Sequence, residues 1–327
     1  MHDCVMPYGE PVYFTGKYKN NQVFSLFIQH LRCSFVIKEN KIPTIQIKKS
    51  LSFVENEYLE TSNYEVVDLY LTSVDLELFL QQYNVYDLEY IDGYMMKGML
   101  IKEFRDYVDY WGERKIKHGI EGNKGLRTLD KFFMNCLYGK LGSKSKGRSK
   151  IPYYEDGKIK FHIGEEEERK QVYIPAATFI TAYARHMTIT SSQKIRDFSL
   201  EKYGYDAYLY SDTDSIHTLL GEEDVRGLLE VDDNELGKWA IESRFSKAKF
   251  LRQKCYVEEE EEGKLKVTVA GLPSQMHDLV TFDNFKEGAE YYREEKDCIK
   301  EGQGTKKRFK RVPGGIVLVD TSFKIKG

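Results

Sequence analysis

The segment YLYSDTDSIHTLL, from Tyr208 to Leu220, places two aspartates two residues apart between two short runs of alternating apolar residues. The runs predict two β-strands, and the polar centre predicts the turn between them. Because residues i and i+2 of an extended chain point to the same side, Asp212 and Asp214 are expected to converge at the hairpin tip. Carboxylates are the ligands that Mg²⁺ prefers, together with substrate phosphates. The alternative is an ordinary Asp-rich turn, since Asp and Ser are common turn residues.

The segment KGLRTLDKFFMNCLYGK, residues 124–140, has the periodicity of an amphipathic helix. One of its stripes is apolar and consists of Leu126, Leu129, Phe133 and Leu137. A second stripe is cationic and aromatic and consists of Arg127, Lys131, Asn135 and Tyr138. Cations complement phosphates and a phenol ring offers a stacking surface, so this stripe suits a nucleotide. The alternative for this segment is an ordinary amphipathic surface helix.

The rest of the chain mixes strand and helix patterns, with no internal repeat and no long low-complexity linker. Residues 10–50 predict an antiparallel sheet. Residues 51–100 predict a short strand, a helix from Ser73 to Tyr83 and another strand, which suggest a small inserted subdomain. Helices are further expected at 102–143 and 175–198, hairpins at 205–220 and 254–270, and a β element at the C-terminus. The fold class is therefore α+β.

Charge is distributed unevenly along the chain, although the net charge is only −3. Residues 101–150 carry 13 Lys and Arg against 6 Asp and Glu, and a second basic run, KKRFKR, spans Lys306 to Arg311. Acidic runs at 164–170 and 258–264 are interpreted as solvated faces and turns. The same interpretation is open for the two basic clusters, but each of them lies beside a motif discussed below, and the net charge argues against indiscriminate binding of nucleic acid.

Length and composition describe a globular chain of 327 residues, 41% of them hydrophobic, long enough for about two domains or one large one. Its five cysteines form no CxxC pair, which argues against a disulfide framework and a structural zinc site. We find no apolar run of transmembrane length and no signal-peptide pattern at the N-terminus. The sequence therefore predicts a cytoplasmic protein with no membrane partner.

Three ordered motifs resemble those of family B DNA polymerases. YSDTDS resembles their motif C, usually written YxDTDS, and KFFMNCLYG resembles their motif B, KxxxNSxYG. LRQKCY, with Lys254 and Tyr256, resembles the KxY motif of the protein-primed branch. Linking segments across essentially the whole chain, from MPYGEPVYFTGKY to GGIVLVDTSFKIK, resemble a bacteriophage protein-primed replicative polymerase from just past motif A to its C-terminus. The bacterial host cytoplasm is then the expected location.

The resemblance implies the palm, fingers and thumb of a right-hand polymerase, with an antiparallel palm sheet and two insertions. The first insertion is implicated in priming-protein docking and the second in strand displacement and processivity. The implied segments are the N-terminal palm (1–45), the first insertion (46–103), the fingers (104–143), the second insertion (144–172), the palm with motif C and KxY (173–275) and the thumb with the C-terminus (276–327).

The resemblance also assigns roles to individual residues. Asp212 and Asp214 would be the catalytic carboxylates that hold two Mg²⁺ ions. The nucleotide would be bound by Lys131 and Arg127 through its triphosphate, by Asn135 and Tyr138 in the nucleotide and template-base pocket, and by Lys115 at the triphosphate or the priming protein. Primer-template DNA would be bound by Lys254 and Tyr256 and by the thumb cations Lys306, Lys307 and Arg308. The implied partners are this DNA, deoxynucleoside triphosphates (dNTPs) and a terminal priming protein.

Two departures from the family pattern bear on activity. The motif B serine is Cys136, whose thiol is expected to be buried and tolerated. The larger departure is that motif A, DxxSLYP, is absent, as is the exonuclease domain that usually precedes it. Met1 resembles a methionine that closely follows motif A, so the chain is expected to begin just downstream of a third carboxylate. Alone, it is expected to have little or no polymerase activity.

The missing motif leaves several interpretations open: a truncated or mis-started reading frame, one half of a split polymerase with a separate upstream exonuclease and motif A fragment, or a degenerate remnant. A rival hypothesis is a non-catalytic module that binds DNA or the priming protein, for which the two aspartates would not matter. A third is a Ca²⁺-binding β-protein that uses the Asp-rich turn. That hypothesis leaves the cationic stripe of 124–140 unexplained.

Overall fold

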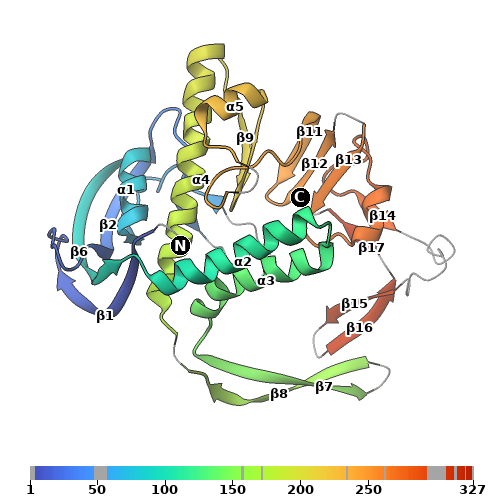
Figure 1. The fold of residues 1–327 in the computed structure, drawn as a ribbon, viewed down its shortest axis with the longest axis horizontal. Coiled ribbons are helices and arrows are strands. Elements are labelled where there is room, and N and C mark those ends of the chain that lie inside the picture. The colour runs from blue at the N-terminus through green and yellow to red at the C-terminus, as the bar shows by residue number, and fades with distance from the viewer. Residues whose placement is uncertain are drawn as a thin grey trace. The chain divides into compact units, whose positions relative to one another are not determined.

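The computed structural model describes residues 4–47, 57–155, 158–170, 172–232, 235–260, 263–292, 307–312, 315–320 and 322–325. The chain forms two compact units (Figure 1). The first unit comprises Met1–Ser143 and Gln171–Ile241, and the second comprises Lys144–Lys170 and Glu242–Gly327. Both contain antiparallel strands, and the first also contains long helices, which confirms the α+β prediction.

The main sheet of the first unit has the strand order β1-β6-β2-β5, and all of its neighbours are antiparallel. β5 and β6 come from the segment predicted as a separate insertion, yet they pair with β2 and β1 of the N-terminal segment. The boundary expected at residues 45 and 46 therefore does not coincide with a break between sheets. The strands are β1 (Met6–Thr15), β2 (Leu26–Ile37), β5 (Val67–Thr72) and β6 (Tyr83–Met99).

Helix α1 (Ser73–Gln82) covers one part of this sheet and confirms the helix predicted there. Its N-terminus is capped by Thr72, whose hydroxyl oxygen accepts from the backbone N–H of Asp75 at 3.0 Å. Its apolar side chains bury themselves among residues of the neighbouring strands. The buried members of this cluster are Leu31, Cys33, Phe35, Ile45, Leu76, Phe79 and Tyr83.

Tyr83 ties the short strands β3 (Gln46–Ile47) and β4 (Glu57–Tyr58) to the sheet. Its hydroxyl donates to the carbonyl of Leu59 at 2.8 Å. The same oxygen accepts from the backbone N–H groups of Thr44 at 2.8 Å and Ile45 at 3.2 Å. Tyr83 is only 1% exposed, so water does not reach its hydroxyl to replace these hydrogen bonds.

Helix α4 (Ile174–Tyr203) is the longest helix described and extends beyond both ends of the helix predicted at 175–198. Gly204 ends it in the left-handed conformation, with φ 74°, a common termination for helices. After α4 come β9 (Tyr208–Asp212) and β10 (Ser215–Thr218), which form the predicted antiparallel hairpin, and then α5 (Glu222–Leu228). α4, this hairpin and α5 share a buried cluster that includes Ile195, Ala207 and Val225.

Residues 102–143 form two helices, α2 (Lys102–Ile120) and α3 (Lys124–Leu141), as predicted. The turn between them contains Gly122, at φ 70°. Asn123 then caps α3, because its side-chain oxygen accepts from the backbone N–H of Leu126 at 3.1 Å. The two helices pack side by side (Figure 1).

The second unit consists of small antiparallel sheets with the orders β15-β16-β8-β7, β11-β12-β13 and β14-β17. The hairpin predicted at 254–270 is confirmed as β12 and β13. Its elements are β7 (Lys146–Glu155), β8 (Lys158–Glu168), β11 (Phe245–Arg252), β12 (Cys255–Glu260), β13 (Leu265–Val269), η1 (Ser274–Leu279), β14 (Glu290–Tyr292), β15 (Lys307–Val312), β16 (Gly315–Asp320) and β17 (Ser322–Lys324). Across both units, no helix among the described residues is long and apolar enough to cross a membrane.

Tyr83→Phe removes the hydroxyl and leaves the N–H groups of Thr44 and Ile45 without their acceptor. We expect the free energy of unfolding to fall by about 1–3 kcal/mol, the cost of unsatisfied buried donors. Denaturant titration by circular dichroism measures it. Tyr86→Phe, at an exposed tyrosine of the same strand, is the control and should change stability little. Equal stability of the two variants would contradict the role given to the Tyr83 hydroxyl.

Candidate metal and nucleotide site

The β9–β10 hairpin places Asp212 at the end of β9 and Asp214 in the two-residue turn that follows. Asp212 ends β9 and is paired with Ser215, the first residue of β10, so Thr213 and Asp214 form the turn itself. The backbone N–H of Asp214 donates to the carbonyl of Asp212 at 2.6 Å. The Thr213 hydroxyl donates to Asp212 Oδ1 at 3.0 Å. Asp212 is half-buried and Asp214 is exposed, so both carboxylates are placed at the end of a short, tight hairpin.

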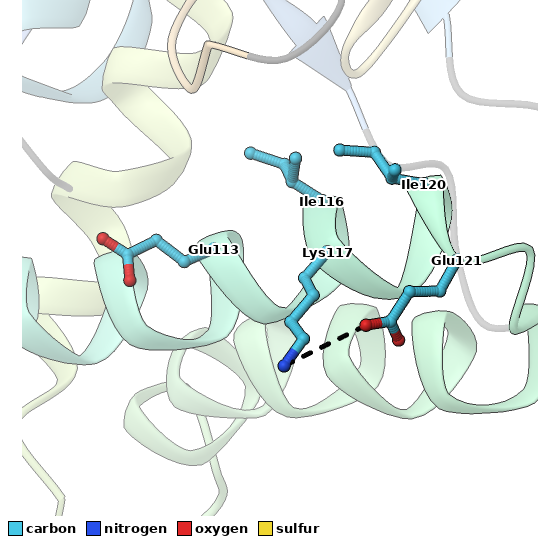
Figure 2. A pocket seen from close by; sticks show the side chains of 5 residues that line it. All are labelled: Glu113, Ile116, Lys117, Ile120 and Glu121. Atoms are coloured by element: carbon cyan, nitrogen blue, oxygen red, sulfur yellow. Dashed lines mark ion pairs between the residues drawn. The ribbon is translucent and has the colours of Figure 1, made fainter.

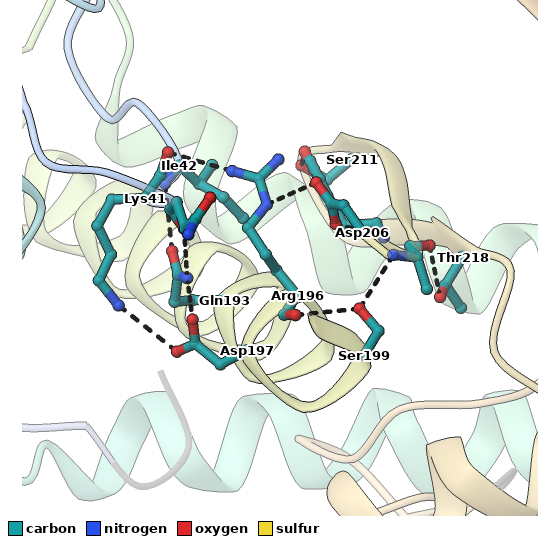
Figure 3. A network of polar contacts seen from close by, with 12 residues as sticks. Lys41, Ile42, Gln193, Arg196, Asp197, Ser199, Asp206, Ser211 and Thr218 are labelled. Carbon is teal, nitrogen blue, oxygen red and sulfur yellow. Dashed lines mark hydrogen bonds and ion pairs between the residues drawn. The ribbon is translucent and has the colours of Figure 1, made fainter. Parts of the chain in front are cut away.

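The start of β9 is tied to α4 by a network of polar contacts (Figure 3). Ser199 accepts from the backbone N–H of Ala207 at 3.0 Å. The Arg196 guanidinium pairs with Asp206, with 2.9 Å between Nε and Oδ2, and lies over the ring of Tyr208. These contacts fix the direction in which the hairpin leaves α4.

Arg196 and Gln193 also hold the loop at residues 40–42 against α4 (Figure 3). Arg196 donates to the carbonyl of Lys41 at 3.1 Å. Gln193 donates to the carbonyl of Asn40 at 3.0 Å and accepts from the backbone N–H of Ile42 at 3.2 Å. The same face of α4 therefore holds both this loop and the root of the hairpin.

The donor set at the hairpin tip fits a divalent cation in part. Two carboxylates are present, and Mg²⁺ commonly uses one or two together with water and phosphate oxygens. Within the described ranges, no group of three or more His, Cys, Asp or Glu side chains is arranged to hold a metal ion. The described residues therefore offer the carboxylates of Asp212 and Asp214, at one turn, as candidate ligands.

One side chain that the sequence did not indicate, the Tyr58 phenol, lies within electrostatic range of Asp212. Burial raises the pKa of the Tyr58 hydroxyl, the Arg185 guanidinium lowers it and the Asp212 carboxylate raises it. Arg185 itself pairs with Asp75, at 3.2 Å between Nε and Oδ1. Tyr58 of β4 is therefore influenced both by Asp212 and by the α4 cation Arg185.

The cationic and aromatic stripe predicted on α3 is exposed along its whole length. Its members are Arg127, Lys131, Asn135 and Tyr138. The described contacts include no hydrogen bond or ion pair to any of these four side chains from another described residue. Because these side chains are exposed, their charged and amide groups are available to a ligand, as a nucleotide-binding surface requires.

The apolar stripe of the same helix is not a fully buried face. Leu126, Leu129 and Phe133 are 39%, 51% and 41% exposed. Cys136, expected to be buried, is only half-buried. The helix instead buries Asp130, whose side chain accepts two hydrogen bonds from α2, so polar pairing replaces apolar packing at this position.

Asp130 locks α3 onto α2 and is only 1% exposed. It lies 2.5 Å from Nδ1 of His118 and 3.2 Å from Nε of Arg114. Burial raises the pKa of Asp130. Hydrogen bonds and positive charge from His118 and Arg114 lower this pKa by more, so the net shift is downward. Beside this cluster the rings of Trp111 and Phe133 stack with centroids 4.6 Å apart. A single aspartate inside a helix pattern gave no signal of this burial.

Lys115 lies on α2 and is half-buried. A shallow surface pocket of about 370 Å³ lies on the same helix (Figure 2). It is lined by Glu113, Ile116, Lys117, Ile120 and Glu121, with Lys117 and Glu121 paired at 4.0 Å. None of the predicted nucleotide-binding side chains lines this pocket, so it gives no support to the role predicted for Lys115.

The predicted primer-binding residues belong to the second unit. Lys254 is exposed in the turn between β11 and β12, at φ 54°. Tyr256 is 9% exposed and its ring lies 5.2 Å from that of Phe250. Lys306 lies outside the described residues, while Lys307 and Arg308 begin β15. The exposure of Lys254 suits a phosphate contact, whereas the buried ring of Tyr256 suits a packing role.

The family described as DNA polymerase type B, organellar and viral, matches residues 1–224, which include both aspartates and α3. The chain belongs to this family. It is 41% identical to the DNA polymerase of Bacillus phage phi29 over 345 residues, covering 100% of this chain and 55% of that protein. It is 35% identical to the DNA polymerase of Streptococcus phage Cp-1, covering 98% of this chain and 53% of that protein. The chain thus spans about half the length of the curated relatives it matches.

Solved structures of the phi29 polymerase share this fold. The complex with primer-template DNA and incoming nucleotide substrates matches with a TM-score of 0.81 at 39% identity, covering 100% of this chain and 55% of that one. The complex with single-stranded DNA matches with a TM-score of 0.78 at 37% identity, covering 100% of this chain and 55% of that one. The predicted resemblance to phage family B polymerases and the predicted polymerase fold are both confirmed. The predicted segment boundaries and residue roles stay predictions.

Asp130→Asn keeps the size of the side chain but removes its charge beside His118 and Arg114. We expect a lower melting temperature at neutral pH, because the lowered pKa of Asp130 means that folding favours its ionised form. That contribution is present above the pKa of an unfolded aspartate, about 3.9, and is lost as pH falls through the lower folded pKa.

The measurement is a set of melting curves for the wild type and Asp130→Asn between pH 3 and pH 7. The two melting temperatures should approach each other at the acidic end. Asp106→Asn serves as the control, because Asp106 forms an exposed pair with Lys102 on α2 and should matter little. A constant difference between Asp130→Asn and the wild type across this range would contradict the ionic lock.

Proposed function

We propose that this chain is the polymerase portion of a template-directed DNA polymerase of the protein-primed phage type. The observation that carries the proposal is the β9–β10 hairpin, which places Asp212 and Asp214 on a tight turn in a chain of the type B family. The reaction would be transfer of a nucleotidyl group from a dNTP to a primer. The crystal complexes of the phi29 enzyme with primer-template DNA and nucleotides support the same ligands here.

Asp212 and Asp214 would hold Mg²⁺ in this site, with phosphate oxygens and water as further ligands. Bound Mg²⁺ would activate the primer 3′-hydroxyl and stabilise the leaving pyrophosphate. The protein's own contribution is to hold both carboxylates on a tight turn, so that no rearrangement is needed when the ligands arrive. A third carboxylate, from a segment that carries motif A, would complete the site.

The exposed stripe of α3 would bind the incoming nucleotide. Lys131 and Arg127 would pair with the triphosphate, since charge-assisted contacts to phosphate are stronger than neutral ones. Asn135 and Tyr138 would contact the sugar and the base pair. The buried pairing of Asp130 supports this role, because it holds a neighbouring face of α3 to α2 and leaves the stripe exposed.

DNA and protein partners would be bound by other parts of the chain. Lys254 and the cations at Lys306, Lys307 and Arg308 would contact DNA phosphates, and Tyr256 would support the primer-binding turn. The segments 46–103 and 144–172 would serve as the two insertions of the protein-primed branch, with a terminal protein docking at the first. A separate exonuclease fragment is a further proposed partner.

Asp212→Asn tests the catalytic role in primer extension with Mg²⁺ and dNTPs, using this chain together with an upstream polypeptide that carries motif A. We expect extension by the wild-type pair and a loss of about 10³-fold or more in the variant, because a missing metal ligand costs several kcal/mol of transition-state stabilisation. The wild-type chain alone should extend poorly. Asp106→Asn, in an exposed pair with Lys102 on α2, is a control for non-specific effects of removing a carboxylate and should lose far less.

Other outcomes of this assay favour different functions. Robust, Asp212-dependent extension by the chain alone would show that two carboxylates suffice. Salt-sensitive binding to primed DNA that persists in Asp212→Ala and Asp214→Ala, with no extension under any condition, would overturn the polymerase proposal in favour of a non-catalytic DNA-binding module.

Lys131→Ala tests the nucleotide-binding stripe. We expect the dissociation constant for a fluorescent dNTP, measured by anisotropy in the presence of Mg²⁺, to rise by about tenfold, as for loss of one hydrogen bond to a charged group. Lys140→Ala is the matched control, because Lys140 lies nine residues further along α3 and faces the opposite side. Equal loss of affinity in both variants would indicate a general charge effect and contradict a defined site.

A further inference from the structure

The turn between the two aspartates makes one contact with α4 that the proposed function does not use. The hydroxyl of Thr188 donates to the backbone carbonyl of Thr213 at 2.7 Å. Thr188 is 6% exposed, so the contact is shielded from water. Its hydroxyl is also 3.1 Å from the carbonyl of Ala184 in its own helix, but its single proton favours the shorter contact. A buried side chain of α4 therefore reaches the one residue that separates Asp212 from Asp214.

The receiving residue has an unfavourable backbone conformation. Thr213 has φ 53°, in the left-handed region, which is uncommon for a β-branched side chain. Such a conformation costs about 1–3 kcal/mol and persists only when the surroundings hold it. Within the hairpin, the Thr213 hydroxyl is occupied with Asp212 and the N–H of Asp214 with the carbonyl of Asp212. Thr188 supplies the contact to Thr213 from outside the hairpin among the described residues.

The orientation of this peptide unit decides where Asp214 points. The Thr213 carbonyl and the Asp214 N–H belong to the same rigid plane, so fixing the carbonyl fixes the start of Asp214. The root of the hairpin is held independently by Ser199 and Arg196. Loss of the Thr188 hydroxyl should therefore leave the hairpin docked and release the tip.

We propose that Thr188 is a positioning residue that holds the Thr213 peptide so that Asp212 and Asp214 face one divalent cation. This inference deepens the proposed function and rests on its metal site. Thr188 acts through the turn and does not touch the metal or the substrate. Its effect is on metal affinity and on the order of the turn.

The test compares Thr188→Val, which has the same shape without a hydroxyl, with Thr188→Ser, which keeps it. Thr190→Val is the matched control, because the Thr190 hydroxyl lies on the same helix and donates only to the carbonyl of His186, among the described residues. Mn²⁺ binding to the full chain is followed by electron paramagnetic resonance, and hydrogen exchange of residues 208–220 is followed by mass spectrometry without metal.

We expect Thr188→Val to weaken Mn²⁺ binding about three- to tenfold, the effect of one lost hydrogen bond, and to speed exchange in the turn. Thr188→Ser and Thr190→Val should behave like the wild type. If Thr188→Val unfolds, Thr188→Ala removes the same hydroxyl without the branched replacement and takes its place.

Unchanged exchange and unchanged Mn²⁺ affinity in Thr188→Val would overturn the proposal, as would equal losses in Thr188→Val and Thr190→Val. Failure of the proposed metal site is a separate result: the wild type and Asp212→Asn would then bind Mn²⁺ equally. In that case the exchange measurement still decides whether Thr188 orders the turn.

Discussion

The hydrogen bond from Thr188 to Thr213 joins the longest helix of the first unit to the turn that carries both aspartates. α4 also holds the root of the hairpin, through Ser199 and Arg196. The positions of both aspartates therefore depend on this one helix. A two-stranded hairpin is marginally stable by itself. Attachment to a helix at both ends gives its two carboxylates a defined position, which a metal site requires because like charges repel each other until a cation binds.

The α2–α3 pair combines two features: α3 exposes a cationic face, and it stays in contact with α2. α3 buries one carboxylate, Asp130, against His118 and Arg114 of α2. Buried ion pairs contribute little net stability but fix one arrangement, because a partly paired charge is costly. This arrangement suits the role proposed for α3, in which Lys131 and Asn135 face a ligand.

The sequence predicted the parts of this protein that have strong local patterns. The hairpin at 208–218, the helices at 73–82 and 102–141 and the exposed cationic stripe followed from periodicity and turn residues, and the motifs identified the family. Long-range pairing was not accessible in this way: the sharing of one sheet by β1, β2, β5 and β6 depends on contacts between residues up to about 90 positions apart.

The burial of Asp130 and the role of Thr188 were also beyond sequence patterns. An aspartate in a helix and a threonine in a helix are both common on surfaces, and only their partners in three dimensions distinguish them. The apolar stripe of α3 shows the converse, because Leu129 and Phe133 recur with apolar periodicity without being buried. Periodicity indicates which residues share a face, but the neighbouring element decides what that face contacts.

The most direct test of the central claim is to locate the bound metal in the polypeptide itself. Fe²⁺ in place of Mg²⁺, with ascorbate and peroxide, generates radicals that cleave the backbone near the ion, and mass spectrometry identifies the new chain ends. The site described above predicts cleavage centred on residues 212–214, suppressed by excess Mg²⁺ and lost in Asp212→Asn. Cleavage elsewhere, or cleavage at the turn that persists in Asp212→Asn, would contradict it.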